Sequence, residues 1–128
     1  MAIRVVRLGS PRTAGEGLRL GTVRRPPRGV PKSEHASRDF YDVWLPDLAP
    51  SEALVKQALA ASDARAWRAF VMRYRAEMKR PPADRLLALL AALSHETALA
   101  VGCYCVEEAR CHRSVLRELL TEHGADVD

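Results

Sequence analysis

Apolar and polar residues alternate in two short stretches near the start of the chain, residues 2–8 and 18–23. Strict alternation is typical of strands that bury one face, so both stretches are predicted to be strands. The loop between them is rich in glycine, and residues 24–32 hold three prolines and a glycine, which exclude regular structure there. Residues 39–45 carry aromatic and β-branched side chains and are interpreted as a short third strand.

The pattern becomes helical from residue 51. Residues 51–60 are predicted to form one helix, and Asp63 is a suitable N-cap for a second. The second helix carries a stripe of apolar residues spaced three and four apart, namely Trp67, Phe70, Val71, Tyr74 and Met78. Pro81 and Pro82 end it, and a leucine-rich helix follows up to Leu93. A last helix around residues 115–120 is expected to end before Gly124.

Residues 97–105 form a nearly continuous apolar run between the third and last helices. Such a run is typical of a strand buried on both faces in the middle of a parallel sheet. The strand, the following loop and the last helix make a βα unit. The chain is therefore predicted to be one small three-layer α/β domain, residues 1–128, with a short, mainly parallel sheet flanked by helices.

The composition agrees with a globular protein, since 48% of the 128 residues are hydrophobic and 28% are charged. No apolar run approaches the roughly 20 residues that cross a bilayer, and no secretory signal is visible at the start of the sequence. We therefore expect a cytoplasmic protein with no membrane partner.

The net charge of +4 is unevenly distributed. The first 32 residues hold eight basic side chains and one acid, whereas the remaining residues hold 12 basic and 15 acidic side chains. A basic segment of this density attracts phosphates, nucleotides or nucleic acid. Alternatively, the arginines only keep an exposed strand and loop in solution.

The turn between the apolar strand and the last helix holds the most reactive side chains of the sequence. Cys105 would lie at the end of the strand, and Cys111, His112 and Arg113 in or near the first turn of the helix. A helix N-terminus stabilises a thiolate and binds anions through its free amides. The turn is therefore a candidate catalytic site, with Cys105 or Cys111 as the nucleophile and His112 as its acid or base.

Three other interpretations of the cysteines stay open. Zinc sites favour paired C-x2-C knuckles, which are missing, so we expect no metal and no cofactor. Cys105 and Cys111 could instead close a disulfide across the turn. Cys103 fits ordinary core packing, because cysteine is among the most buried residue types.

Three segments resemble the YeaO-like proteins, the family of domain of unknown function 488. Residues 28–32 are similar to its R-G-x-S-K stretch, and residues 42–51 to its W-L-x-x-x-A-P-S. The helix with Trp67, Phe70, Tyr74 and Glu77 resembles W-x-x-F-x-x-x-Y-x-x-E, and residues 105–114 resemble a C-x-E with C-H-R-S. The chain departs from the family in lacking the tryptophan of R-L-W-P-R-G and in having Pro31 in place of a serine.

The resemblance implies a small α/β fold and a prokaryotic cytoplasmic protein, and it implies no particular reaction. The site predicted from the sequence adds Arg28, Lys32, Trp44 and Arg113 as substrate-binding residues to the catalytic residues of the turn. We expect a thiol-dependent enzyme acting on a small anionic substrate. The alternative is a module that binds phosphate, a nucleotide or nucleic acid and whose cysteines are structural.

Overall fold

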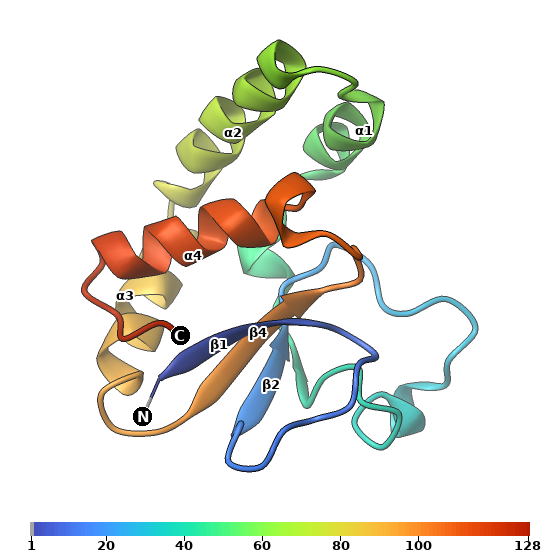
Figure 1. Ribbon diagram of the computed structural model, residues 1–128, viewed down its shortest axis with the longest axis vertical. Coiled ribbons are helices and arrows are strands. Elements are labelled where there is room, and N and C mark those ends of the chain that lie inside the picture. The colour runs from blue at the N-terminus through green and yellow to red at the C-terminus, as the bar shows by residue number, and fades with distance from the viewer. Residues whose placement is uncertain (1) are drawn as a thin grey trace.

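The computed structural model describes residues 2–128, which form a four-stranded parallel sheet and four α-helices (Figure 1). The strands are β1 (Ile3–Arg7), β2 (Leu18–Gly21), β3 (Val43–Trp44) and β4 (Leu99–Cys103). The helices are α1 (Glu52–Ala60), α2 (Ala64–Met78), α3 (Ala83–Leu93) and α4 (His112–Glu122). This arrangement confirms the α/β class, and the sheet is parallel throughout.

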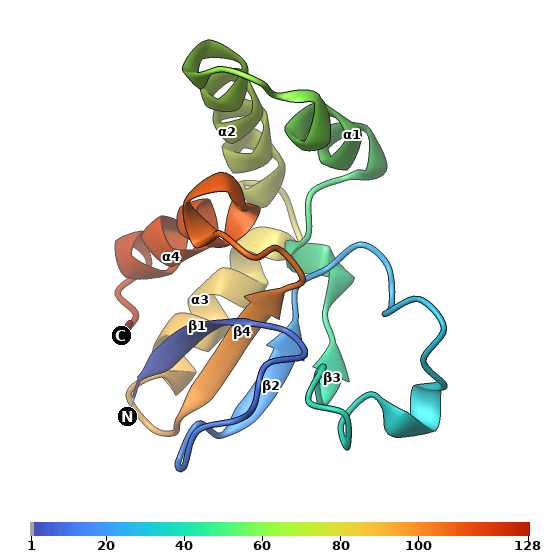
Figure 2. The same cartoon turned by 45° about the vertical axis from the view of Figure 1, so that its right-hand side comes forward.

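The strand order is β1-β4-β2-β3, so the last strand of the chain lies inside the sheet (Figure 2). β4 pairs with β1 from Ile3 opposite Leu99 to Arg7 opposite Cys103, and with β2 from Leu18 opposite Leu99. All five residues of β4 are buried, as its continuous apolar sequence predicts. β4 ends two residues earlier than expected, so Cys105 lies in the loop beyond the strand.

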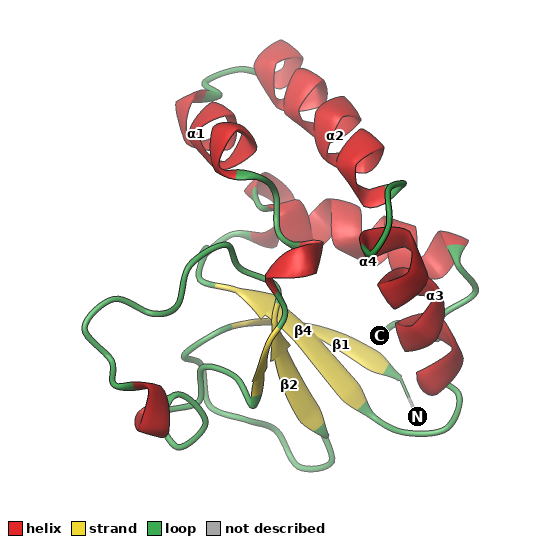
Figure 3. Ribbon diagram, turned by 180° about the vertical axis from the view of Figure 1, so that it is seen from behind, coloured by secondary structure: helices red, strands yellow, loops and turns green. Residues whose placement is uncertain are grey.

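One face of the sheet packs on the helices and forms the main core. Alternate strand residues such as Ile3, Leu99 and Val101 meet apolar residues of α2, α3 and α4, for example Phe70 and Leu116. The stripes predicted on these helices are therefore the faces that pack on the sheet. Figure 3 shows α3 and α4 beside the sheet and the α1–α2 hairpin extending away from it. None of the helices formed by residues 2–128 is long and apolar enough to span a membrane.

The helix boundaries follow the signals in the sequence. The Asp63 side chain accepts a 2.8 Å hydrogen bond from the Ala66 amide and caps α2. α2 ends before Pro81 and Pro82, and α3 starts directly after them. Gly124 follows the end of α4 with φ of +88°, a conformation that glycine adopts without steric cost.

A buried ion pair lies under the loop that joins β1 and β2. The Arg19 side chain is fully buried, and its guanidinium donates to both carboxylate oxygens of Glu16 at 2.8 and 2.9 Å. The same guanidinium donates to the carbonyl oxygens of Ser10 and Asp39. Because side chains alternate along a strand, Arg19 is expected to point away from the helical core. On that side of the sheet it is covered by loop segments and is not exposed to solvent.

The segment from residue 24 to β3 runs irregularly along one side of the molecule, with one short 3₁₀ turn at Lys32–Glu34. The strand expected over residues 39–45 is reduced to Val43 and Trp44. Asp39 adopts a left-handed φ of +63°, so the chain turns there and cannot yet be extended.

Candidate functional site

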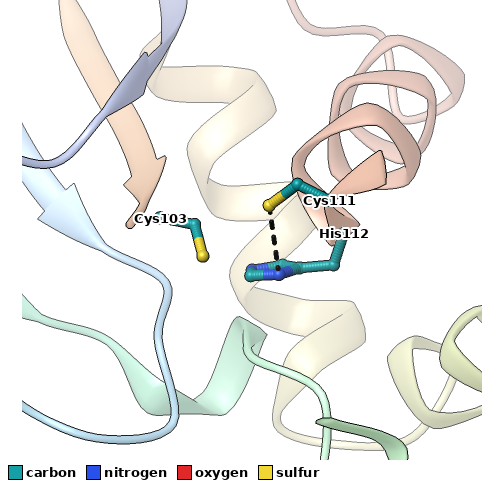
Figure 4. A group of neighbouring side chains, drawn as sticks. All are labelled: Cys103, Cys111 and His112. Atoms are coloured by element: carbon teal, nitrogen blue, oxygen red, sulfur yellow. Dashed lines mark hydrogen bonds between the residues drawn. The ribbon is translucent and has the colours of Figure 1, made fainter. Parts of the chain in front are cut away.

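The end of β4 and the start of α4 bring three sulfur atoms and one imidazole together. Cys103 is the last residue of β4, and its buried side chain packs with Cys111, the residue before α4, in a second core cluster. Cys111 is the N-cap residue of α4, and His112 is its first residue. Figure 4 shows the side chains of Cys103, Cys111 and His112 directed toward one another. Their sulfur and nitrogen atoms lie within 4.8 Å of one another.

His112 is held in one orientation by a hydrogen bond on the far side of its ring. Nε2 lies 2.7 Å from the carbonyl oxygen of Thr22, which can only accept, so Nε2 carries a proton. In the neutral ring, Nδ1 is then a free acceptor, and it lies 3.8 Å from the sulfur of Cys111. The ring edge packs on Tyr74 at a centroid distance of 5.5 Å. This pair has the arrangement of a thiol beside an oriented base.

Cys105 is the exposed member of the three thiols, whereas Cys103 and Cys111 are buried. The sulfurs of Cys103 and Cys105 lie 3.8 Å apart. Hydrogen bonds from the Cys103 and Cys111 thiols, followed by the charge of Arg113, lower the pKa of Cys105. Hydrogen bonds to Cys105 and Cys111, together with burial, raise the pKa of Cys103. Cys103 therefore keeps its proton and donates it, while the thiolate is favoured on the exposed Cys105.

The pKa of Cys111 is also lowered, first by the hydrogen bond with Cys103 and further by His112. The free amides and partial positive charge at the N-terminus of α4 act in the same direction. The hydrogen bond with Cys105 and burial act in the opposite direction and raise the pKa of Cys111.

Arg113 lies behind the turn instead of in the open site. Its side chain is only 3% exposed, and Nη2 donates a 2.7 Å hydrogen bond to the carbonyl oxygen of Cys105. Nε is buried and has no hydrogen-bond partner within residues 2–128. The sequence suggested a substrate-binding role for Arg113, and the structure shows a cation that fixes the position of Cys105 from inside the protein.

A cavity of about 400 Å³ opens over the sulfurs. The three cysteines and His112 are part of its lining. Apolar residues from α1, α2 and the neighbouring loops also line it, namely Val23, Pro50, Val55, Ala58, Leu59 and Phe70. Arg24, Arg25, Lys56 and Arg110 supply positive charge around it, and Glu52, which pairs with Arg25, supplies one negative charge.

The structure divides the residues predicted from the sequence between two pockets. Cys105, Cys111 and His112 line the cavity just described. Lys32 and Trp44 line a second pocket on the side of the irregular segment, and Arg28 is exposed and lines neither of these two pockets. Cys103 packs in the core, as the sequence predicts, and it also lies beside Cys111 and His112 in the cavity lining, where the predicted site did not include it. Its place at the end of a buried strand, on the same face as Cys105, was the available signal.

The same donors could also hold a metal ion. Cys103, Cys111 and His112 offer two sulfurs and one ring nitrogen, the soft ligands that zinc prefers. The hydrogen bond from Nε2 of His112 to the Thr22 carbonyl would orient the ring for such a role as well as for catalysis.

Comparison with known proteins gives one match. The family model DUF488-N3a, described as the active DUF488-N3 subclade, matches residues 3–124. No curated protein and no solved structure matches the chain.

Proposed function

The chain belongs to the DUF488 family, as its YeaO-like motifs predicted, and from this premise we propose that it is a thiol-dependent enzyme. The observation that carries the proposal is the convergence of three thiols and an oriented imidazole on one cavity. Cys105 is the nucleophile, because it is the exposed thiol and its pKa is lowered. His112 and Cys111 hold and return the proton.

The reaction is a nucleophilic group transfer. The Cys105 thiolate forms a bond to an electrophilic atom of the substrate, and the bond from that atom to the leaving group breaks with its electron pair. The leaving group takes the proton held by the His112–Cys111 pair. A second nucleophile with an O–H or N–H group then bonds to the same atom, the bond to Cys105 breaks with its electron pair to restore the thiolate, and the proton of that nucleophile returns to the pair. Arg113 fixes the carbonyl of Cys105 and keeps the attacking sulfur in place.

The cavity supports a substrate with an apolar part and an anionic group. Its wall is formed by aliphatic and aromatic side chains, whereas Lys56 and Arg110 on its lining provide exposed cations. Arg24 is less available, since its guanidinium donates to the carbonyl oxygens of Pro46, Ala49 and Pro50. The apolar part would lie along α1 and the anion near Lys56 or Arg110.

We also propose a cytoplasmic location and a single domain over residues 1–128. The three clustered cysteines are free thiols, and free thiols persist in a reducing compartment, which supports the cytoplasmic location. The match of one family model to residues 3–124 supports the single domain.

The test is a pH series of alkylation by iodoacetamide, with the modified cysteine identified by mass spectrometry. We expect Cys105 to react first and to stay reactive well below the free-thiol pKa of about 8.5. Cys105→Ser should remove the fast phase, whereas Cys103→Ser should keep a fast phase with a higher pH midpoint, because Cys105 loses a donor. Thiols that all titrate near the free value would contradict the proposal.

A metal analysis of the purified protein distinguishes the enzyme proposal from the alternative that Cys103, Cys111 and His112 bind a metal ion. A stoichiometric zinc ion whose removal is needed before any cysteine reacts would show that the donors are ligands instead of catalysts. The enzyme proposal expects the alkylation rate of Cys105 to be the same with and without a chelator.

A further inference from the structure

The second pocket lies between the irregular segment and the edge of the sheet and has a volume of about 450 Å³. It is separate from the thiol cavity in its lining, and the proposed reaction does not use it. Its lining combines aromatic rings with charged groups: Lys32, His35, Tyr41, Asp42 and Trp44. This combination points to a flat polar ligand more than to an apolar one.

Trp44 provides a fixed ring with an open face. Its indole nitrogen donates a 2.8 Å hydrogen bond to the carbonyl oxygen of Val23, yet the residue is 43% exposed. Next to it in the lining, Tyr41 and His35 contact each other edge to face at a centroid distance of 5.1 Å. A pinned, exposed indole is a platform on which a heteroaromatic ring stacks, and it loses little conformational freedom on binding.

Tyr41 adds an unsatisfied polar group. The residue is 4% exposed, and its hydroxyl has no hydrogen-bond partner within residues 2–128. The Tyr41 ring packs directly on Gly21, where an added Cβ would lie 2.3 Å from a ring carbon, so the ring has little room to move. Tyr41 is therefore a fixed, buried part of the pocket lining.

The charge balance of the pocket favours an anion. The carboxylate of Asp42 is already paired, since it accepts hydrogen bonds from the guanidinium of Arg12 at 2.8 and 3.1 Å and from the Arg19 amide at 2.8 Å. Its charge is therefore matched inside the protein. Lys32 is exposed on the lining and leaves the pocket positive.

We infer that this pocket binds a free nucleotide. The base lies against the exposed ring of Trp44, and the phosphate meets Lys32. The site is independent of the thiol chemistry, but the two are physically linked. Val23 lines the thiol cavity while its carbonyl holds Trp44, so a ligand on Trp44 contacts a residue anchored to the wall of the other pocket.

The experiment is a fluorescence titration in a Trp67→Phe background, so that Trp44 is the sole tryptophan. The probes are AMP and GMP, with adenosine and inorganic phosphate as the two halves of the ligand. We expect saturable quenching by at least one of the two mononucleotides and weaker binding of adenosine. Lys32→Ala should raise the Kd by about tenfold, as for the loss of a charge-assisted hydrogen bond. Arg28→Ala is the matched control, because Arg28 is an exposed cation of the same segment outside the pocket lining and should leave the Kd unchanged.

Circular dichroism confirms that each variant is folded. The absence of saturable quenching by both nucleotides would overturn the inference, and so would equal losses in Lys32→Ala and Arg28→Ala, which would indicate unspecific attraction. If a short oligoadenylate bound far more tightly than AMP, the ligand of this pocket would be a nucleic-acid strand and the free-nucleotide inference would be wrong. None of these outcomes depends on the reactivity of Cys105.

Discussion

His112 donates its Nε2 proton across 2.7 Å to the carbonyl oxygen of Thr22, a residue 90 positions earlier in the chain. This contact ties the start of α4 to the end of β2 and decides which ring nitrogen faces Cys111. One hydrogen bond thus connects the packing of the fold to the protonation of the site.

His112→Gln should keep the fold and weaken the thiolate. The glutamine amide can donate to the Thr22 carbonyl, but it offers no base to Cys111. Since Cys103 and His112 both lower the pKa of Cys111, we expect removal of the imidazole to raise that pKa. The ultraviolet absorbance of thiolate, followed against pH, measures the shift. An unchanged titration curve in a folded variant would show that His112 does not act on the thiols.

Arg113→Met should move the alkylation profile of Cys105 to higher pH. The variant keeps much of the side-chain volume but loses the positive charge and the hydrogen bond to the Cys105 carbonyl. Because the charge favours the thiolate, the midpoint of alkylation should rise by roughly one unit. Arg113→Lys should recover part of this shift, and Arg110→Met, on the exposed part of the same turn, should cause a much smaller one. A shift of the same size in Arg110→Met would assign the effect to general surface charge.

Glu16→Gln should destabilise the protein strongly without touching the thiol site. Arg19 would remain fully buried without its charge partner, and breaking such a pair costs about 3–5 kcal/mol of unfolding free energy. Urea denaturation at neutral pH measures the loss. If the variant unfolds at the same urea concentration as the parent, the pair makes no net contribution.

The same pair predicts loss of stability in acid. Burial raises the pKa of Glu16, but the hydrogen bonds and charge of Arg19 outweigh it, so the folded-state pKa lies below the ordinary value of 4.5. A group with a lowered pKa stabilises the fold above its unfolded pKa, and this contribution disappears as the pH falls through the folded value. The parent should therefore lose stability below about pH 4.5 more steeply than Glu16→Gln, in urea melts over a pH series. Parallel pH dependence in the two proteins would contradict the assignment.

Tyr74→Phe tests whether the Tyr74 hydroxyl stabilises the fold without affecting the reactivity of Cys105. The Tyr74 hydroxyl is buried and donates a 2.6 Å hydrogen bond to the Leu48 carbonyl, while the ring edge supports His112. Phenylalanine keeps the ring and leaves the carbonyl without a donor, at a cost of about 1–3 kcal/mol in unfolding free energy. The alkylation rate of Cys105 should stay at the parent value. A slower rate in the folded variant would mean that the hydroxyl, and not only the ring, positions the site.

The regular elements could be predicted because each has local signals. Asp63, Pro82 and Gly124 mark helix boundaries, and the apolar run before Cys105 marks the central strand. The approach of Cys105 to Cys111 and His112 followed from the same reasoning, because a strand end and the next helix start adjoin in a βα unit.

The parts that could not be predicted depend on contacts that no local pattern encodes. Trp44 and Lys32 lie in a pocket of their own because the irregular segment folds back on itself, and proline-rich loops carry no period. Arg113 looks like a ligand-binding cation in the sequence, but α4 turns it inward to the Cys105 carbonyl. Arg19 likewise looks solvent-exposed until Glu16 and the loop carbonyls are placed around it.

The position of β4 between β1 and β2 has a consequence for how the protein comes into being. The two N-terminal strands lie on either side of β4, whose paired residues follow those of β1 by 96 positions and those of β2 by 81, so these pairings cannot form until most of the chain has been synthesised. Contacts this distant in sequence are made late and together, which favours an all-or-none folding step. Because Cys103 ends β4 and Cys111 starts the next helix, the same step assembles the thiol cluster. In a nascent or partly folded chain, Cys103, Cys111 and His112 are therefore not yet held together.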